Sequence, residues 1–331
     1  MPKDTRDVIL DVDTGSDDAC AIMLAAASPE INLLGVVAVN GNRPLADTVK
    51  NTLQVAELLG ISGKVPVVKG AAAAICHDLL PGRTKNPKTP EIQFDSDGNE
   101  VCYHPKKFSL PDPVTKPVDK NFVTWYIETI MNNPRPVTVV SVGPLTDLAL
   151  VLRAEPDIVS NIEEIVIMGG GHEQRNSTAA AEFNIWKDPE AAQIVLESGA
   201  KIMLVPLDAT HAASTRASEI QQYKDLGTPA GAFMAELLEV RTNAYNILQP
   251  LYEPDLCPMH DALCIAYLLD PSVLQNVIHT RVDVDISGGF ADGMTIIDTR
   301  HFHNRPDNCY VALSADRDLF NEILYRRIAS L

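Results

Sequence analysis

Basic residues are scarce in this chain, which has 27 lysines and arginines against 44 aspartates and glutamates and a formal net charge of −17. A surface with this excess of negative charge repels polyphosphates and anionic lipid headgroups. We therefore exclude nucleic acid and membrane surfaces as partners. The sequence also lacks an uncharged apolar run of about 18 residues, the length that spans a bilayer as a helix.

Paired cysteine motifs are missing as well. None of the six cysteines forms a Cys-x-x-Cys, which argues against a zinc ribbon or a thioredoxin-type site. Cys20 and Cys264 lie in apolar helical stretches, where buried free thiols are common. An even count permits disulfides, but we expect reduced thiols and a cytoplasmic location. The first residues, MPKDTRDVILDVD, contain no apolar run typical of a secretory signal peptide.

Short apolar runs alternate with helical patterns through the first two-thirds of the chain. The runs are continuous rather than alternating in polarity, which is typical of parallel strands covered on both faces. We expect strands at 8–12, 33–39, 65–68, 137–142, 164–168 and 201–207, and helices at 17–28, 44–59, 119–132, 145–154 and 188–197. The alternation predicts an α/β fold with an open, mostly parallel, Rossmann-like sheet and helices on both faces.

The pattern changes after residue 210. We expect helices at 215–247 and 259–270, strands at 277–286, 294–298 and 308–313, and a closing helix at 316–329. No linker-like composition separates these parts, so the sequence predicts a single domain over 1–331 with a C-terminal helical and β elaboration. A long, proline-rich loop at about 77–118 has no clear period. Such a loop is a lid, a binding loop or an excursion over the surface.

Four aspartates lie close together near the N-terminus: Asp11, Asp13, Asp17 and Asp18. Asp11 and Asp13 are two residues apart, so they share one face of an extended chain at the carboxyl end of the first strand, where open α/β sheets bind ligands. Asp17 and Asp18 open the next helix, whose dipole and free N–H groups favour anions. Helix capping explains one of these two, but it does not explain the first two aspartates.

These carboxylates repel one another strongly unless proton sharing, the helix dipole or a cation relieves the repulsion. Hard oxygen ligands suit calcium or magnesium. The aspartates therefore predict a divalent-metal site.

Two later segments carry further polar groups. The string MGGGHEQRNSTAAAEFNIWKDPEAA follows an expected strand and offers Asn176, Glu182 and Asn184, which are suited to sugar hydroxyls. Ordinary loop chemistry explains such groups equally well. His260 and Asp261 open another apolar helix, where the aspartate can simply be a cap.

Taken together, these motifs resemble those of the nucleoside hydrolases. The segment 11–19, DVDTGSDDA, is similar to the family signature Asp-x-Asp-x-Gly-x-Asp-Asp-Ala. Later parts of the chain resemble further motifs of the family. They are Asn42 in VAVNGN, Val142 in SVGPLTDLA, the segment MGGG…Asn…Glu-Phe-Asn, and the His-Asp pair. The resemblance runs from residue 7 to about 270 in family order. The first Asp-x-Asp also resembles haloacid-dehalogenase-type phosphatases, but no second phosphatase motif follows.

The resemblance implies hydrolysis of the N-glycosidic bond of ribonucleosides to free base and ribose, in purine and pyrimidine salvage. It implies one Ca²⁺ on Asp13, Asp18, the main-chain carbonyl of Val142 and Asp261, with Asp13 also the general base. The ribose would be bound by Asp17, Asn42, Met168, Asn176, Glu182 and Asn184. His260 would face the base and give it a proton, and Asp11 would support the ligands from behind. A homodimer or homotetramer is also implied.

Two alternatives remain open from the sequence. One is a magnesium-dependent phosphatase with Asp11 as nucleophile, and the other is a non-catalytic nucleoside or ribose binder. The carboxylate-rich site favours a neutral nucleoside over a nucleotide, because a phosphate pocket requires cations.

Base preference is not predicted, because the loops at 76–118 and 223–257 are the least family-like parts. Many family members carry a histidine after the third strand, which His77 can replace, and one purine-preferring branch has tryptophan where this chain has His260. We expect Trp125 and Trp186 in the core. Tyr245 and Tyr252 lie near the expected mouth of the site, where they either contact the base or have a packing role.

Overall fold

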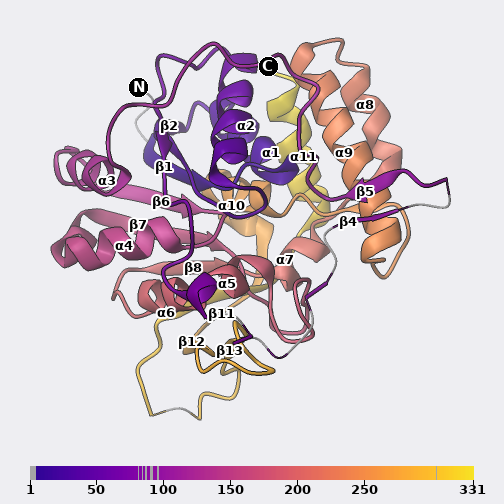
Figure 1. Cartoon of the computed structure of the whole chain (residues 1–331). Coiled ribbons are helices and arrows are strands. Elements are labelled where there is room, and N and C mark those ends of the chain that lie inside the picture. Colours follow the sequence, from indigo (N-terminus) through magenta and orange to yellow (C-terminus); the bar gives the residue numbers. More distant parts are fainter. Residues whose placement is uncertain are drawn as a thin grey trace.

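A single large sheet organises the molecule. The computed structural model describes residues 5–80, 82, 83, 85, 88, 89, 92–94, 97–302 and 304–331. Within them, the main sheet has eight strands in the order β11-β14-β8-β7-β6-β1-β2-β3 (Figure 1). All neighbours are parallel except β11 and β14, which pair antiparallel at one edge. The predicted open, mostly parallel sheet is therefore confirmed.

The order of the strands places a crevice in the middle of this sheet. Its members are β1 (Arg6–Val12), β2 (Ile31–Ala38), β3 (Val67–Lys69), β6 (Val137–Ser141), β7 (Ile162–Met168), β8 (Ile202–Val205), β11 (Leu274–Thr280) and β14 (Cys309–Ala315). The chain runs outward from β1 to β3 and then returns to place β6 on the other side of β1. Open α/β sheets bind ligands where the direction of winding switches, which here is between β1 and β6.

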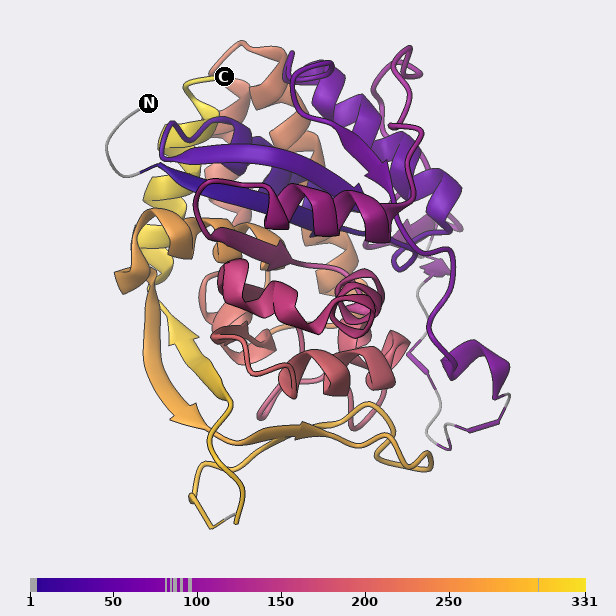
Figure 2. The same ribbon diagram turned by 90° about the vertical axis from the view of Figure 1, so that its left-hand side faces the viewer.

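Helices cover both faces of the sheet, as the continuous apolar strands predict (Figures 1 and 2). One face carries α1 (Ser16–Ala26), α2 (Leu45–Leu58), α9 (Pro229–Leu248), α10 (His260–Leu269) and α11 (Arg317–Ile328). The other carries α3 (Phe122–Met131), α4 (Thr146–Ala154) and α6 (Pro189–Leu196). Leu10 and Ile9, adjacent on β1, belong to the two opposite cores, and both are fully buried. Among the described residues, no helix is both long and apolar enough to cross a membrane.

The predicted helix over 215–247 is wrong in its first half. This stretch contains β9 (Thr215–Arg216), a 3-10 turn (Ala217–Glu219), α8 (Ile220–Lys224) and only then α9. Gly227 has a φ of 67°, which ends the earlier helix. Thr228 then caps α9 by accepting a hydrogen bond from the Gly231 N–H at 3.0 Å. The Gly-Thr-Pro sequence at 227–229 ends one helix and begins the next. The prediction missed this break because the apolar periodicity continues on both sides of it.

The C-terminal β elaboration divides into two parts. The strand β14 enters the main sheet beside β8, whereas β12 (Val282–Val284) and β13 (Thr295–Ile297) form a separate hairpin. The predicted strand over 277–286 is consequently split between β11 and β12. Short elements that the sequence did not indicate are α5 (Phe183–Lys187), α7 (Leu207–Ala212) and β10 (Leu256–Cys257), which pairs with β9.

The described residues of the long loop include short regular elements and contacts with the rest of the fold. It contains a 3-10 turn (His77–Leu79) and the antiparallel pair β4 (Ile92–Phe94) and β5 (Glu100–Cys102). The strand β5 lies against α9. Phe108, which is 1% exposed, packs its ring edge-on against Phe233 of α9 at 5.2 Å between centroids. The described part of the loop from 100 to 108 thus packs on the body of the protein.

Candidate active site

Polar groups converge at the carboxyl edge of the sheet, at its switch point. Asp13 follows β1, Val142 follows β6, and Met168 ends β7. Carboxyl ends of parallel strands meet at one edge, so these residues are brought together although they are far apart in the sequence. One pocket there is lined by nine of the residues that the sequence predicted: Asp17, Asn42, Val142, Met168, Asn176, Glu182, Asn184, His260 and Asp261.

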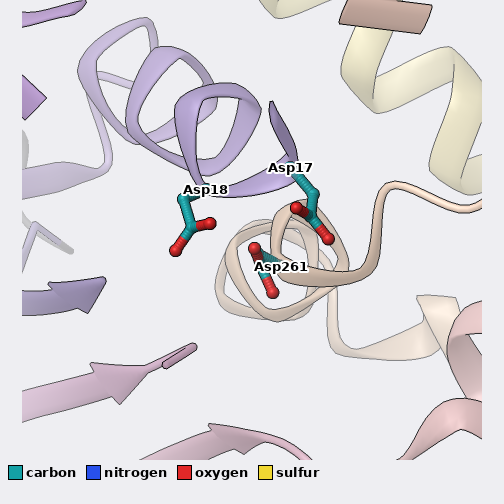
Figure 3. A group of neighbouring side chains, drawn as sticks. All are labelled: Asp17, Asp18 and Asp261. Carbon is teal, nitrogen blue, oxygen red and sulfur yellow. The ribbon is translucent and has the colours of Figure 1, made fainter. Parts of the chain in front are cut away.

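Three carboxylates lie face to face beside this pocket (Figure 3). Asp17 and Asp18 come from the first turn of α1, and Asp261 comes from the first turn of α10. One oxygen from each lies within 4.8 Å of one from each of the others. The two helices pack against each other, which brings Asp261 beside aspartates some 240 residues earlier. These three residues are at most 4% exposed.

Backbone groups fix the carboxylate of Asp18. Its Oδ1 accepts the Asp13 N–H at 2.9 Å, and its Oδ2 accepts the Gly15 N–H at 2.8 Å. The side-chain nitrogen of Asn42, Nδ2, donates to the same Oδ2 of Asp18 at 3.3 Å. The capping role therefore falls to Asp18, and it orients this carboxylate without exhausting its lone pairs.

Asp13 is 1% exposed and is not among the residues that line the pocket. Its Oδ2 accepts the Asn42 N–H at 2.5 Å, whereas its buried Oδ1 has no hydrogen-bond partner among the described residues. Glycine is required at position 41, because a Cβ there would lie 2.0 Å from Oδ2. A buried carboxylate oxygen without a donor is costly unless a proton or a cation meets it. The carboxylate oxygens gathered here fit a divalent cation with hard oxygen ligands.

Burial and mutual repulsion raise the pKa of these carboxyl groups. Burial is the main cause for Asp13, Asp18 and Asp261, and neighbouring aspartates add to it. The pKa of Asp18 is raised to about 6. A cation stabilises the ionised forms, so its binding would release protons from the cluster.

Asn184 links two carbonyl groups of the sheet edge. Its side-chain nitrogen donates to the Val142 oxygen at 2.8 Å and to the Met168 oxygen at 3.1 Å. A carbonyl oxygen has two lone pairs, so the Val142 oxygen retains one for another partner. The Val142 carbonyl oxygen, which is the expected metal ligand, is thus oriented by Asn184, a residue that was predicted only to bind the sugar.

Glu182 and Asn176 shape the segment after β7. Glu182 caps α5, with its carboxylate accepting the N–H groups of Asn184 at 2.9 Å and of Gly170 at 2.9 Å. Burial raises its pKa to about 7. The Oδ1 of Asn176 accepts the Phe183 N–H at 2.9 Å. Both side chains line the pocket while the backbone holds them in place.

His260 is held between two hydroxyl groups. Its Nδ1 lies 2.7 Å from the Thr210 Oγ1, and its Nε2 lies 2.6 Å from the Tyr245 hydroxyl. Burial, followed by the charge of Arg241, pushes its pKa well below the usual value, so the ring is neutral. Tyr245 is 3% exposed and lines the pocket. Of the two roles that the sequence left open for this tyrosine, its position favours contact with the substrate.

Several residues at the pocket were missed from the sequence. Arg241 of α9 donates to the Asp17 Oδ1 at 3.1 Å. Tyr103 and His104, from the long loop, line the pocket, and the Nδ1 of His104 accepts the Ser16 N–H at 3.3 Å. These residues belong to no motif. For Tyr103 and His104 the only signal was the length of the loop, and Arg241 had none.

Other sequence candidates lie elsewhere. Asp11 is fully buried and accepts the Tyr126 hydroxyl at 2.6 Å, on the face of the sheet that carries α3, and it is absent from the pocket lining. Its support of the metal ligands stays a prediction. His77 lies 3.5 Å from Asp292 and does not line the pocket. Tyr252 is 66% exposed.

The two tryptophans differ. Trp125 is 8% exposed and lies in the core, as expected. Trp186 is half-buried and packs its ring edge-on against His77, so its placement in the core is only partly right.

The fold and the site together define a class. An open α/β sheet carries buried carboxylates at its switch point, and amide and carboxylate groups suited to hydroxyls stand beside them. This is the arrangement of an enzyme that acts on a sugar-bearing small molecule at a divalent-metal site.

Comparison with known proteins names the family. The sequence profile described as inosine-uridine preferring nucleoside hydrolase matches residues 8–322. The chain belongs to this family. It is 36% identical over 318 residues to the inosine-uridine preferring nucleoside hydrolase of Leishmania major, with 95% of each chain covered. It is 34% identical over 321 residues to the pyrimidine-specific ribonucleoside hydrolase RihA of Salmonella paratyphi B, with 97% of each chain covered.

Comparison with solved structures supports the same family. A purine-preferring ribonucleoside hydrolase from Gardnerella vaginalis superimposes with a TM-score of 0.83 at 30% identity, and 98% of each chain is covered. Ribonucleoside hydrolysis, the activity predicted from the sequence, is confirmed, and the phosphatase and non-catalytic alternatives are not favoured. The base preferences in the names of these relatives differ from one another.

Proposed function

We propose that this ribonucleoside hydrolase works with one calcium ion bound by Asp13, Asp18, the Val142 carbonyl and Asp261. The supporting observation is the buried Oδ1 of Asp13, which has no hydrogen-bond partner among the described residues. Asp13 is joined to the carboxylate cluster of Asp17, Asp18 and Asp261 through its N–H, which donates to the Asp18 Oδ1 at 2.9 Å. Calcium is preferred to magnesium because its larger shell accepts seven or eight oxygens, some of them from the substrate.

Asp13 is the proposed general base. A bound divalent cation lowers the pKa of a water molecule and orients it. Asp13 then takes the proton as the water oxygen attacks C1′ of the ribose. Positive charge develops on the ribosyl centre, as in other glycoside hydrolysis, and the neighbouring carboxylates stabilise it. The unpartnered Oδ1 is the oxygen with room for that proton.

The ribose hydroxyls are assigned to the polar groups at the sheet edge. Carboxylates accept from hydroxyl groups, and side-chain amides both donate and accept. Met168 packs against the sugar ring. The groups assigned to the hydroxyls are Asp17, Asn42, Asn176, Glu182 and Asn184. Since the backbone fixes Glu182 and Asn176, they bind without losing much conformational freedom.

The departing base takes its proton from His260. The ring is neutral, and its two nitrogens face the hydroxyl groups of Thr210 and Tyr245. When the His260 Nε2–H donates to the Tyr245 hydroxyl, that hydroxyl can give its own proton to the base and take the proton of the ring in its place. A neutral donor suits a leaving group that gains a proton during bond cleavage. Both residues line the pocket, as the role requires.

We also propose a single catalytic domain over 1–331, a homodimer or homotetramer, and a cytoplasmic location. The six cysteines are all free, which supports a reducing compartment. The proposed substrates are neutral ribonucleosides, consistent with a formal net charge of −17.

A reducing-sugar assay tests the proposal. Inosine, uridine and a nucleoside monophosphate are each incubated with enzyme, with and without a chelator, and calcium or magnesium is then added back. We expect ribose from at least one nucleoside, loss of activity on chelation, and better recovery with calcium. Activity that survives exhaustive chelation would contradict the metal, and full recovery with magnesium alone would contradict calcium.

A further inference from the structure

Arg241 is a buried charge that the motifs of the site do not include. It is 1% exposed, and its guanidinium forms an ion pair with the carboxylate of Asp17. Its Nη1 donates to the Asp17 Oδ1 and to the Ser16 Oγ, each at 3.1 Å, and its Nε donates to the Pro258 carbonyl at 3.1 Å. Arginine stays charged in such surroundings.

These three contacts join the two segments that supply the carboxylates. Ser16 and Asp17 belong to the first turn of α1, and Pro258 lies three residues before Asp261 of α10. The guanidinium also lies 5.5 Å from the ring centroid of Tyr245, one turn further along α9. One side chain therefore contacts the start of α1, the approach to α10 and the tyrosine that meets His260.

The carboxylate cluster has one more candidate ligand than the proposed calcium site uses. Oxygens of Asp17, Asp18 and Asp261 are all within 4.8 Å of one another (Figure 3). A cation placed among them would attract Asp17 as strongly as the other two unless something opposes it. Arg241 forms an ion pair with Asp17, and the Nδ1 of His104 lies 3.6 Å from the same Oδ1. A carboxylate in an ion pair with arginine is a weaker metal ligand.

We propose that Arg241 is a positioning residue, which keeps Asp17 out of the calcium shell and directs it to the ribose hydroxyls. This inference rests on the proposed metal and ribose sites. It goes beyond them because it states that a residue on α9 determines which aspartates bind the metal and which one binds the ribose. Removing the guanidinium should transfer Asp17 from the sugar to the metal.

The direct test is calcium affinity, measured by isothermal titration calorimetry on chelator-treated protein. Arg241→Met, which keeps an unbranched apolar side chain, should bind calcium about tenfold or more tightly, because a positive charge leaves and Asp17 becomes available. Arg241→Lys retains the charge and should remain close to wild type. The double variant Asp17→Asn/Arg241→Met loses both members of the pair and should return toward the wild-type affinity.

Kinetics provide the second measurement. Arg241→Met should raise the KM for a nucleoside about tenfold in saturating calcium, because a ribose acceptor is lost. Arg281 is another buried arginine, 4% exposed, which pairs with Glu197 and Asp283 away from the pocket. Arg281→Met is the control for general destabilisation and should leave calcium affinity unchanged.

The outcomes separate the two proposals. If wild-type protein binds no calcium, the proposed metal site fails before Arg241 is considered. If wild type binds calcium but Arg241→Met binds it equally or more weakly, the positioning role is wrong. Should Arg241→Met not fold, Asp17→Asn decides alone: a loss of affinity as large as that of Asp18→Asn would show that Asp17 is a ligand in the wild type and would overturn the inference.

Discussion

The two walls of the pocket are built differently. On the sheet-edge wall, Val142 directly follows a strand and Asp17 lies in the first turn of a helix. Asp13 and Asp18 belong to the same segment of the chain as Asp17, and their carboxylates accept backbone N–H groups. On the loop wall, Tyr103 packs its ring on Tyr245 at 5.0 Å between centroids, and His104 rests on the start of α1. The first wall is part of the folded sheet, whereas the second depends on side chains from a long loop.

This difference has a functional consequence. Groups fixed by the sheet suit the invariant parts of the reaction, namely the water, the metal and the ribose. Groups on a loop can change without disturbing the sheet, so they suit the base, which differs between substrates. We therefore expect substitutions on the first wall to affect turnover and those on the second to affect substrate choice.

The largest effect is expected at Asp13. Asp13→Asn keeps the size of the side chain but removes the proposed base and a metal ligand, so kcat should fall on the order of 10⁴-fold or more. Circular dichroism should show an unchanged fold. Near-normal ribose release by the folded variant would remove Asp13 from the chemistry.

His260 lies between the two walls, and its variant separates them. His260→Ala should reduce kcat with inosine and uridine by about 10²–10⁴-fold, because base departure loses its proton donor. A riboside with 4-nitrophenolate as leaving group needs no proton and should be cleaved nearly as well as by wild type. An equal loss on both substrates would mean that His260 supports the structure rather than the leaving group.

Asp147 tests how much it costs to ionise a buried carboxylate behind the sheet-edge wall. Burial raises its pKa from 3.8 to about 7, so the folded protein binds a proton there that the unfolded chain releases. Stability must therefore fall as the pH rises from about 4 to 7. Asp147→Asn removes this loss and keeps the acceptor for the Ala71 N–H, which is bonded at 2.7 Å.

The variant should be more stable than wild type at pH 8 by roughly 2–4 kcal/mol and similar to it at pH 4. Urea unfolding in saturating calcium, at both pH values, measures this. Equal stability at pH 8 would show that Asp147 is ionised at little cost in the native protein.

The smallest effect is expected on the loop wall. His104→Ala should change KM by about 3–10-fold, with different factors for inosine and uridine, and leave kcat for the 4-nitrophenyl riboside unchanged. Steady-state kinetics on the three substrates give the comparison. A uniform loss of kcat on all three would place His104 with the catalytic groups and erase the distinction between the walls.

The sheet-edge wall could be predicted from the sequence because its residues lie next to regular elements. Asp13, Val142 and Asp261 each adjoin a strand or helix whose apolar pattern is plain, and parallel strands bring their ends together. The same logic predicted most helix positions to within a few residues. It failed at 215–247, where an apolar period continues through the Gly-Thr-Pro break.

The loop wall could not be predicted, for a physical reason. The position of Tyr103 and His104 depends on contacts with Ser16 and Tyr245, which are distant in the sequence. Arg241 was equally hidden, because its neighbours on α9 are ordinary helix residues and its partners come from two other segments. No local period or turn signal encodes such contacts.

Calcium titration of wild type and Asp18→Asn by calorimetry, after exhaustive chelation, tests the central claim most directly. The account predicts one calcium per chain in the wild type, with protons released on binding, and an affinity lower by about 100-fold or more in the variant. Equal calcium binding by the two proteins, or none by the folded wild type, would contradict a metal site built from the aspartates at the switch point of the sheet.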